Sequence, residues 1–164
     1  MINRLDRAPA VIVDRDGVLN DLVFDLLDGV GESPLRWEDV RLAPGAAKAL
    51  GELHRFGARV FCATNQPAAA KGKCSVEDLL LVQRRVEELL MVDGIRLDGV
   101  KMCFHHPSGV VASLSGVCGC RKPATGLLDA LSKQYEIDLA KSWMVGDMLG
   151  VEVVCSGMDF NMRL

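Results

Sequence analysis

The chain has 164 residues, of which 49% are hydrophobic and 25% charged, and its net charge is −3. This length is typical of one domain with a sizeable core, and the charge balance offers no basic surface for nucleic acid or an anionic membrane. The N-terminus lacks the apolar segment of a signal peptide, and no apolar run reaches the ~18 residues of a membrane span. We therefore expect a soluble cytoplasmic protein with a single domain over residues 1–164.

Predicted strands and helices alternate along the chain. They are a strand at 10–13, an excursion at about 20–43, a helix from Pro44-Gly45 to Gly57, a strand at 59–63, a helix from a Ser75/Asp78 capping box to Asp93-Gly94, a strand at 99–103, a helix with Pro123 in its first turn that runs to about Tyr135, and a strand at 142–145. This alternation predicts an α/β fold, in which a parallel sheet lies between two layers of helices.

Polar side chains follow three of the predicted strands. Asp14 and Asp16 follow the first, Thr64-Asn65-Gln66 follow the second, and Gly146-Asp147 follow the fourth. In an open α/β sheet, ligands bind beyond the carboxyl ends of the strands, so these segments are expected to converge. Each motif alone is also compatible with an ordinary solvated turn; their order and shared position favour a binding site.

The chemistry of these side chains points to a phosphate and a divalent cation. Three aspartates, Asp14, Asp16 and Asp147, form a negative cluster suited to Mg²⁺, which prefers carboxylate, carbonyl and water oxygens. Thr64 can donate a hydrogen bond to a phosphate oxygen, and Lys122 adds a positive charge. We therefore predict a phosphoryl-transfer site.

A second cluster lies between the third strand and Lys122. The spacing Cys103-x-His105, then Cys118-x-Cys120, provides three thiolates and an imidazole, a set suited to tetrahedral structural Zn²⁺. Four protein ligands leave no open position for water, so we predict a structural zinc in the loop 103–120. Free thiols beside a surface histidine are the alternative, and His106 is interpreted as a neighbour of the site.

The segments DRDGVLN, ATNQ, CRKP and MVGD stand in the order of the four motifs of the haloacid dehalogenase superfamily. From about residue 9 to Asp147 the chain resembles its zinc-containing branch, the histidinol-phosphatase and heptose-bisphosphate phosphatase group. The resemblance implies a three-layer Rossmann-like fold of the superfamily type without a cap domain, with residues 20–43 as a flap-like segment. It also implies Mg²⁺ and Zn²⁺ as cofactors.

The resemblance further implies a role for each site residue. Asp14 would be the nucleophile, and Asp16 would be the general acid and then the general base. Thr64 and Lys122 would hold the phosphoryl oxygens, while Asn65, Gln66 and Arg121 would border or bind the substrate. Mg²⁺ would be held by Asp14, the backbone carbonyl of Asp16 and Asp147.

The sequence departs from the family pattern near its end. Val151 stands where the family has a second acid, Met148 stands where this branch often has a basic residue, and only 17 residues follow Asp147. We expect an exposed sheet edge that favours self-association. The expected oligomeric state is a monomer or a weak homo-oligomer. A stable monomer in light scattering at low concentration would remove this expectation.

Several functions remain open at this stage. The leading one is a Mg²⁺-dependent phosphomonoesterase for a small phosphorylated sugar or polyol, with heptose 1,7-bisphosphate favoured by the CxHHP form of the loop. Histidinol phosphate is the alternative substrate, and a catalytically impaired phosphate-binding protein is the alternative class. A receiver-type signalling domain is discarded, because the position of its phosphorylated aspartate holds Cys103.

Overall fold

The computed structural model describes residues 7–24 and 31–146, and its fold is built on one parallel sheet. The strands are β1 (Ala10–Val13), β4 (Arg59–Asn65), β5 (Gly99–Cys103) and β6 (Trp143–Val145), and their order in the sheet is β5-β4-β1-β6. All four lie close to the predicted positions. Strand β4 runs two residues further than predicted and therefore includes Thr64 and Asn65.

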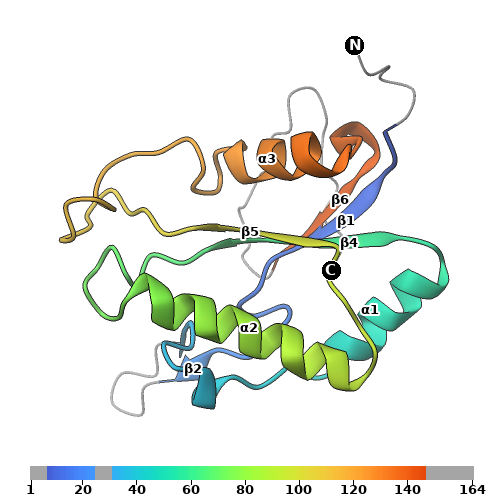
Figure 1. The fold of residues 1–164 in the computed structure, drawn as a ribbon, viewed down its shortest axis with the longest axis horizontal. Helices are drawn as coiled ribbons and strands as arrows, with labels where there is room; N and C mark the ends of the chain where they lie inside the picture. The colour runs from blue at the N-terminus through green and yellow to red at the C-terminus, as the bar shows by residue number, and fades with distance from the viewer. Residues whose placement is uncertain (1–6, 25–30, 147–164) are drawn as a thin grey trace.

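Helices cover both faces of the sheet, as predicted. Helices α1 (Ala46–Arg55) and α2 (Val76–Val92) lie on one side, and α3 (Gly126–Tyr135) lies on the other (Figure 1). The described residues also form two short 3₁₀ helices, η2 (Trp37–Asp39) and η3 (Leu139–Lys141). The α/β fold with three layers is therefore confirmed.

The local signals for α2 and α1 are borne out. The Ser75 hydroxyl accepts a hydrogen bond from the backbone N–H of Asp78, and the Asp78 carboxylate accepts one from the backbone N–H of Ser75, so α2 begins with the predicted capping box. Gly57 has φ +77° just beyond α1, a conformation that a glycine adopts at little cost.

The predicted start of α3 is wrong by three residues. Pro123 lies in a turn closed by the N–H of Ala124 on the carbonyl of Arg121, and the helix begins at Gly126. The N–H of Gly126 donates instead to the carbonyl of Gly119 at 2.9 Å. The start of α3 is therefore set by the preceding loop, a tertiary contact that proline statistics do not report.

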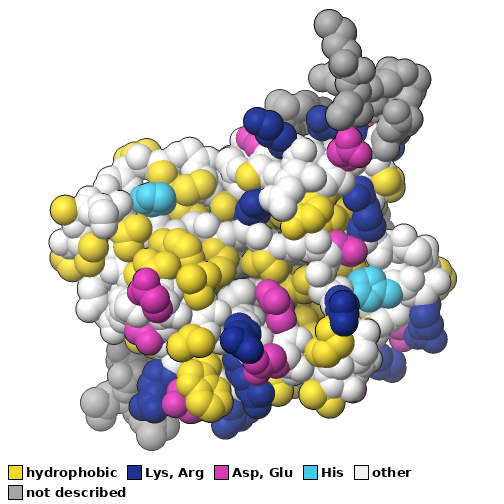
Figure 2. All heavy atoms as spheres, in the orientation of Figure 1, with side chains coloured by type: hydrophobic (Ala, Val, Ile, Leu, Met, Phe, Trp, Pro, Cys, Tyr) yellow, Lys and Arg dark blue, Asp and Glu magenta, His cyan; other side chains and the backbone are white. Residues whose placement is uncertain are grey.

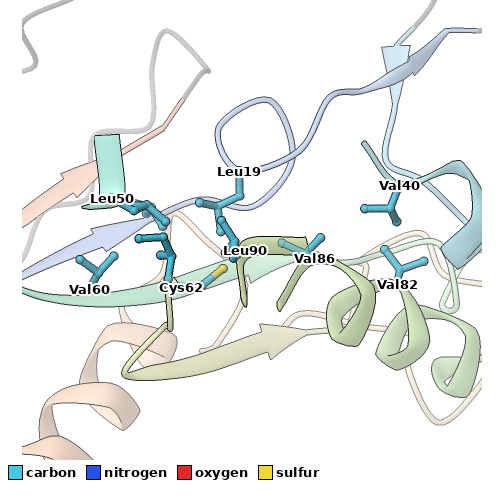
Figure 3. Close-up of a cluster of buried hydrophobic side chains, with 10 residues drawn as sticks. Leu19, Val40, Leu50, Val60, Cys62, Val82, Val86 and Leu90 are labelled. Carbon is cyan, nitrogen blue, oxygen red and sulfur yellow. The ribbon is translucent and has the colours of Figure 1, made fainter. Parts of the chain in front are cut away.

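Two apolar cores lie on opposite faces of the sheet, and together they bury β4 on both sides. Phe61 and Ala63 face α3, whereas Val60 and Cys62 face α1 and α2. Figure 3 shows the second core, in which Leu50 and Leu90 lie near Val60 and Cys62 of the strand, and Val82 of α2 lies beside Val40. Leu19 and Val40 also enter it, each 1% exposed.

The segment of residues 20–43, here called the flap segment, is thus only partly an excursion from the core, as Val40 belongs to the core. Its described part contains a short antiparallel pair, β2 (Val23–Phe24) with β3 (Gly31–Glu32). Lys73, which follows β4, forms an ion pair with Glu32 of this hairpin. The flap segment is therefore tied to the loop after β4.

The surface of the described residues is mixed in character. Figure 2 shows charged side chains over the α1 and α2 half of the molecule and hydrophobic ones in the middle of the same face, in front of the sheet. Within the described part of the chain, no helix combines the length and the apolar composition that crossing a membrane requires.

Candidate active site and metal centre

The predicted site residues gather at the carboxyl edge of the sheet, where the strand order reverses. Strand β1 lies between β4, which follows it in the chain, and β6, which ends the sheet on the other side. Asp14 directly follows β1, and its N–H donates to the carbonyl of Val145 at the end of β6, at 2.8 Å. Such a switch point opens a crevice between neighbouring loops.

Asp14 faces Lys122 across this edge. The Lys122 ammonium donates to Asp14 Oδ2 at 2.5 Å and to the carbonyl of Ala63 at 2.8 Å. The Lys122 side chain is 4% exposed, whereas that of Asp14 is 20% exposed. A carboxylate that is open to solvent on one side and paired with a buried cation on the other suits an attack on an anionic substrate.

Asp16 is surrounded by hydrogen-bond donors. Both of its oxygens accept from Arg15, at 3.0 and 3.1 Å, and Gln66 Nε2 donates to Oδ2 at 2.5 Å. Asn20 Nδ2 donates to Oδ1 at 3.0 Å, and Ser33 Oγ donates to Oδ2 at 2.8 Å. The described part of the flap segment therefore reaches the site through Ser33.

Sequence reasoning missed three of these partners, namely Arg15, Asn20 and Ser33. An arginine between two acids, in a segment that follows an apolar strand, is a signal for the first of them. Gly17, whose φ is +77°, makes the turn that brings the side chains of this segment together. Its N–H donates to the carbonyl of Asn20 at 2.8 Å and closes the turn.

The polar residues at the end of β4 also lie in the site, but their side chains are occupied. Asn65 donates to the carbonyl of Lys122 at 3.1 Å and accepts from its N–H at 3.0 Å. Gln66 Nε2 also donates to the hydroxyl of Thr64 at 2.9 Å. In this arrangement the two amides hold Lys122 and Asp16, and among the described residues the Thr64 hydroxyl donates no hydrogen bond.

The four predicted metal ligands, Cys103, His105, Cys118 and Cys120, form one cluster. Their ligand atoms all lie within 4.8 Å of one another. The three sulfur–sulfur distances are 3.1, 3.2 and 3.6 Å, and Nδ1 of His105 lies 3.5 Å from the sulfur of Cys120. Zinc–sulfur bonds of about 2.3 Å place the corners of a tetrahedron about 3.8 Å apart, so the set fits one such ion.

The sulfur atoms are too far apart for disulfides, whose S–S length is about 2.05 Å. Burial raises the pKa of Cys103. Burial, together with the hydrogen bonds that the Cys120 thiol donates to the sulfurs of Cys118 and Cys103, raises the pKa of Cys120 to about 12. Burial also acts against ionisation of Cys118, but hydrogen bonds from Cys120 and the N–H of Arg121 outweigh it and lower the pKa. Metal binding must therefore displace protons from this cluster.

His106 lies outside the cluster. Its Nδ1 accepts from the N–H of Ser108 at 3.1 Å, so this ring nitrogen is used within the loop. The interpretation of His106 as a neighbour of the metal ligands agrees with this geometry.

The Cys/His loop (residues 103–120) adjoins the carboxyl edge through the chain itself. The N–H of Arg121 donates to the sulfur of Cys118 at 3.3 Å, and its guanidinium donates to the carbonyl of His105 at 3.4 Å. On the strand side, the carbonyl of Cys103 accepts from the N–H of Gln66 at 2.7 Å. The cluster is thus directly connected to residues that contact Asp14 and Asp16.

The last part of the predicted site lies outside the described residues. This applies to Asp147, the third predicted Mg²⁺ ligand, and to Met148 and Val151, the departures from the family pattern. Strand β6 ends at Val145, directly before Gly146-Asp147.

The fold and the site together define a phosphatase-type domain of the haloacid dehalogenase class.

Comparisons with known proteins agree with this class. No protein-family model matches the sequence. The chain is 36% identical over 141 residues to the D-glycero-beta-D-manno-heptose-1,7-bisphosphate 7-phosphatase of Rhodopseudomonas palustris, which covers 86% of the chain and 74% of that relative. It is 38% identical over 143 residues to the D-glycero-D-manno-heptose-1,7-bisphosphate 7-phosphatase of Thermosynechococcus vestitus, covering 85% and 69%.

Solved structures give the same result. A candidate HAD-like phosphatase from Mesorhizobium loti superposes with a TM-score of 0.77 at 32% identity, over 88% of this chain and 66% of the other. The D,D-heptose 1,7-bisphosphate phosphatase of B. bronchiseptica, complexed with magnesium and phosphate, gives 0.72 at 28% identity, over 88% and 73%. The chain thus spans about two thirds to three quarters of these relatives. It belongs to the heptose-bisphosphate phosphatase branch of the haloacid dehalogenase superfamily.

Proposed function

We propose that this protein is a Mg²⁺-dependent phosphomonoesterase that removes the 7-phosphate of D-glycero-D-manno-heptose 1,7-bisphosphate. The main support is the pairing of the partly exposed Asp14 carboxylate with the buried Lys122 ammonium at the carboxyl edge of the sheet. The substrate is suggested by the names of the relatives. Those names divide between the α and β anomers, so either anomer is a candidate.

In this proposal Asp14 is the nucleophile. One of its carboxylate oxygens attacks phosphorus, the bond to the sugar oxygen breaks, and Asp16 gives its proton to the departing alkoxide. Water then attacks the aspartyl-phosphate, the bond from phosphorus to Asp14 breaks, and Asp16 takes the proton from water. The products are the alcohol and inorganic phosphate, and both aspartates return to their starting states.

The remaining polar residues of the site divide into two groups: those proposed to contact the phosphate, and those proposed to position other site residues. Lys122 and Thr64 are proposed to hold the phosphoryl oxygens, since an ammonium and a hydroxyl can donate there. Asn65 and Gln66 were expected to border the substrate, but their hydrogen bonds to Lys122 and Asp16 favour a positioning role. Arg121 is proposed to help recognise the substrate from the start of the loop that follows Cys120.

Asp14 and Asp16 are the described residues that are proposed to hold Mg²⁺. Asp14 offers a partly exposed carboxylate, the hard oxygen ligand that this ion prefers, and the backbone carbonyl of Asp16 and the carboxylate of Asp147 would complete the protein ligands. The ion, when bound, supplies positive charge that screens the nucleophile from the phosphate.

The Cys/His loop is proposed to hold a structural Zn²⁺ through Cys103, His105, Cys118 and Cys120. The zinc ion would order the loop that leads into Arg121 and Lys122, because the four ligands come from two separate segments of the chain.

The unbridged thiols suit a reducing compartment, so we propose that the protein acts in the cytoplasm.

Phosphate release from both anomers of heptose 1,7-bisphosphate, from histidinol phosphate and from simple sugar phosphates tests this function. We expect Mg²⁺-dependent release that is fastest with a heptose bisphosphate and is lost in Asp14→Asn. Binding of a phosphorylated ligand without any turnover would contradict the proposal and favour a phosphate-binding protein. Preference for histidinol phosphate would contradict the substrate and keep the reaction.

A further inference from the structure

Arg15 is the largest of the fully buried side chains, with 0% exposure, although it carries a charge. Burying a guanidinium is costly unless it is paired and hydrogen-bonded. Its Nε donates to Asp16 Oδ1 and its Nη2 to Asp16 Oδ2, so one planar group contacts both oxygens of the carboxylate. This two-point contact restricts both the position and the rotation of the Asp16 carboxylate.

The same guanidinium determines how Gln66 is oriented. Nη2 also donates to Gln66 Oε1 at 2.6 Å. Because a guanidinium can only donate, the amide oxygen of Gln66 must face Arg15. The amide NH₂ therefore faces the other way, toward Asp16 Oδ2 and the Thr64 hydroxyl. Arg15 thus acts on Asp16 directly and, through Gln66, by a second route.

We propose that Arg15 is the positioning residue that aims Asp16 for proton transfer, and that Gln66 assists it. This inference rests on the proposed function, in which Asp16 protonates the departing sugar oxygen. Arg15 itself is enclosed and touches no substrate. A lysine cannot replace it, since one ammonium on a flexible stem does not make the fork contact with both oxygens and the third bond to Gln66.

The role can be separated from simple structural support by the choice of leaving group. Cleavage of an alkyl phosphate releases a basic alkoxide that needs the proton of Asp16. Cleavage of p-nitrophenyl phosphate releases a stable phenolate that does not. For both substrates, kcat/KM covers the steps up to the first P–O cleavage. A change that impairs only proton donation by Asp16 therefore lowers kcat/KM for the alkyl phosphate much more than for the aryl phosphate.

The experiment compares Arg15→Lys with the wild type and with Arg84→Lys, a matched change in an exposed ion pair on α2. Magnesium-loaded protein is assayed with heptose 1,7-bisphosphate and with p-nitrophenyl phosphate across the pH range. For Arg15→Lys we expect kcat/KM to fall about 10- to 100-fold with the alkyl phosphate and less than about 3-fold with the aryl phosphate. The limbs of the pH profile should shift for the alkyl phosphate, and Arg84→Lys should match the wild type in each measurement.

Gln66→Met provides a second test that keeps the charge pair of Arg15 and Asp16 intact. It should show the same dependence on the leaving group to a smaller extent, and it carries the test if Arg15→Lys does not fold. Equal losses with both substrates in the folded variants would overturn the positioning role and leave the proposed function standing. A wild-type protein that hydrolyses neither substrate would overturn the proposed function and this inference with it.

Discussion

The ammonium of Lys122 lies 2.5 Å from a carboxylate oxygen of Asp14, although 108 residues separate them in the chain. One residue follows the first strand, and the other follows the last ligand of the Cys/His loop by two positions. The pair therefore joins the sheet to that loop. A second bond, from the Lys122 ammonium to the carbonyl of Ala63, fixes the lysine to β4 as well.

Replacing Lys122 by Met should reduce catalysis strongly, because the side chain supplies the positive charge beside the nucleophile. Loss of one preorganised donor at a reacting anion lowers kcat by about 100- to 1,000-fold. Steady-state phosphate release measures this. Lys141→Met, at an exposed ion pair with Asp138, is the matched control and should remain fully active. Similar activity of both variants would contradict the role of Lys122.

Replacing Asn65 by Ala tests whether this residue positions Lys122 or binds the substrate. The change removes two hydrogen bonds to the backbone of Lys122, so the free energy of unfolding should fall by about 1–3 kcal/mol and kcat should fall. Inorganic phosphate should inhibit the variant at nearly the same concentration as the wild type. A large rise in that concentration with unchanged stability would instead show direct contact with the phosphate group.

Replacing Gly126 by Ala should weaken metal binding by the Cys/His loop. A Cβ at Gly126 would stand 2.3 Å from the carbonyl oxygen of Gly119, so the Cys/His loop must move. Gly119 stands between Cys118 and Cys120 in the chain, so this movement would disturb two of the metal ligands. A Cβ at Gly119 meets nothing within 4 Å, which makes Gly119→Ala the matched control.

Metal analysis after dialysis against a chelator measures the effect. We expect about one zinc per chain in the wild type and in Gly119→Ala, and faster loss of the metal from Gly126→Ala. Cys118→Ser should lose the metal as well. Full zinc content in Cys118→Ser would contradict the assignment of the four ligands.

The buried Cys62 thiol should make the fold sensitive to alkaline pH. Burial raises its pKa to about 12, whereas an unfolded chain has an ordinary cysteine pKa of about 8.5. Between these values the folded state keeps a proton that the unfolded state has lost. The free energy of unfolding therefore falls as pH rises through this window, by up to about 1.4 kcal/mol per pH unit from this group.

Urea unfolding of the wild type and of Cys62→Ala at pH 8 to 10.5 isolates this contribution. The variant is expected to be less stable at pH 8, because it leaves a cavity, but to lose stability less steeply with pH. Parallel pH dependences in the two proteins would contradict the assignment to Cys62. Native Cys62 should also resist thiol reagents until the protein unfolds.

The fold was largely predictable because its signals are local. The strands at 10–13 and 99–103 are short apolar runs, and the capping box and the apolar face of α2 indicate that helix. The start of α3 was not predictable from local sequence, since a contact between Gly126 and Gly119 determines it. Val40 was missed for the same reason, as nothing near it in the sequence shows that it packs against α2.

The sequence by itself determined which chemical groups are available and in what order. Paired aspartates, a lysine and the CxH…CxC set were identified from residue type and spacing alone, and the gathering of strand ends follows from parallel topology. Tertiary structure alone decided which of these groups touch. Asn65 and Gln66 were expected at the substrate, yet their amides bind Lys122 and Asp16, and Arg15 was not singled out at all. Hydrogen bonds depend on distances of a few tenths of an ångström between segments far apart in the chain, and such distances arise only when the whole sheet is packed.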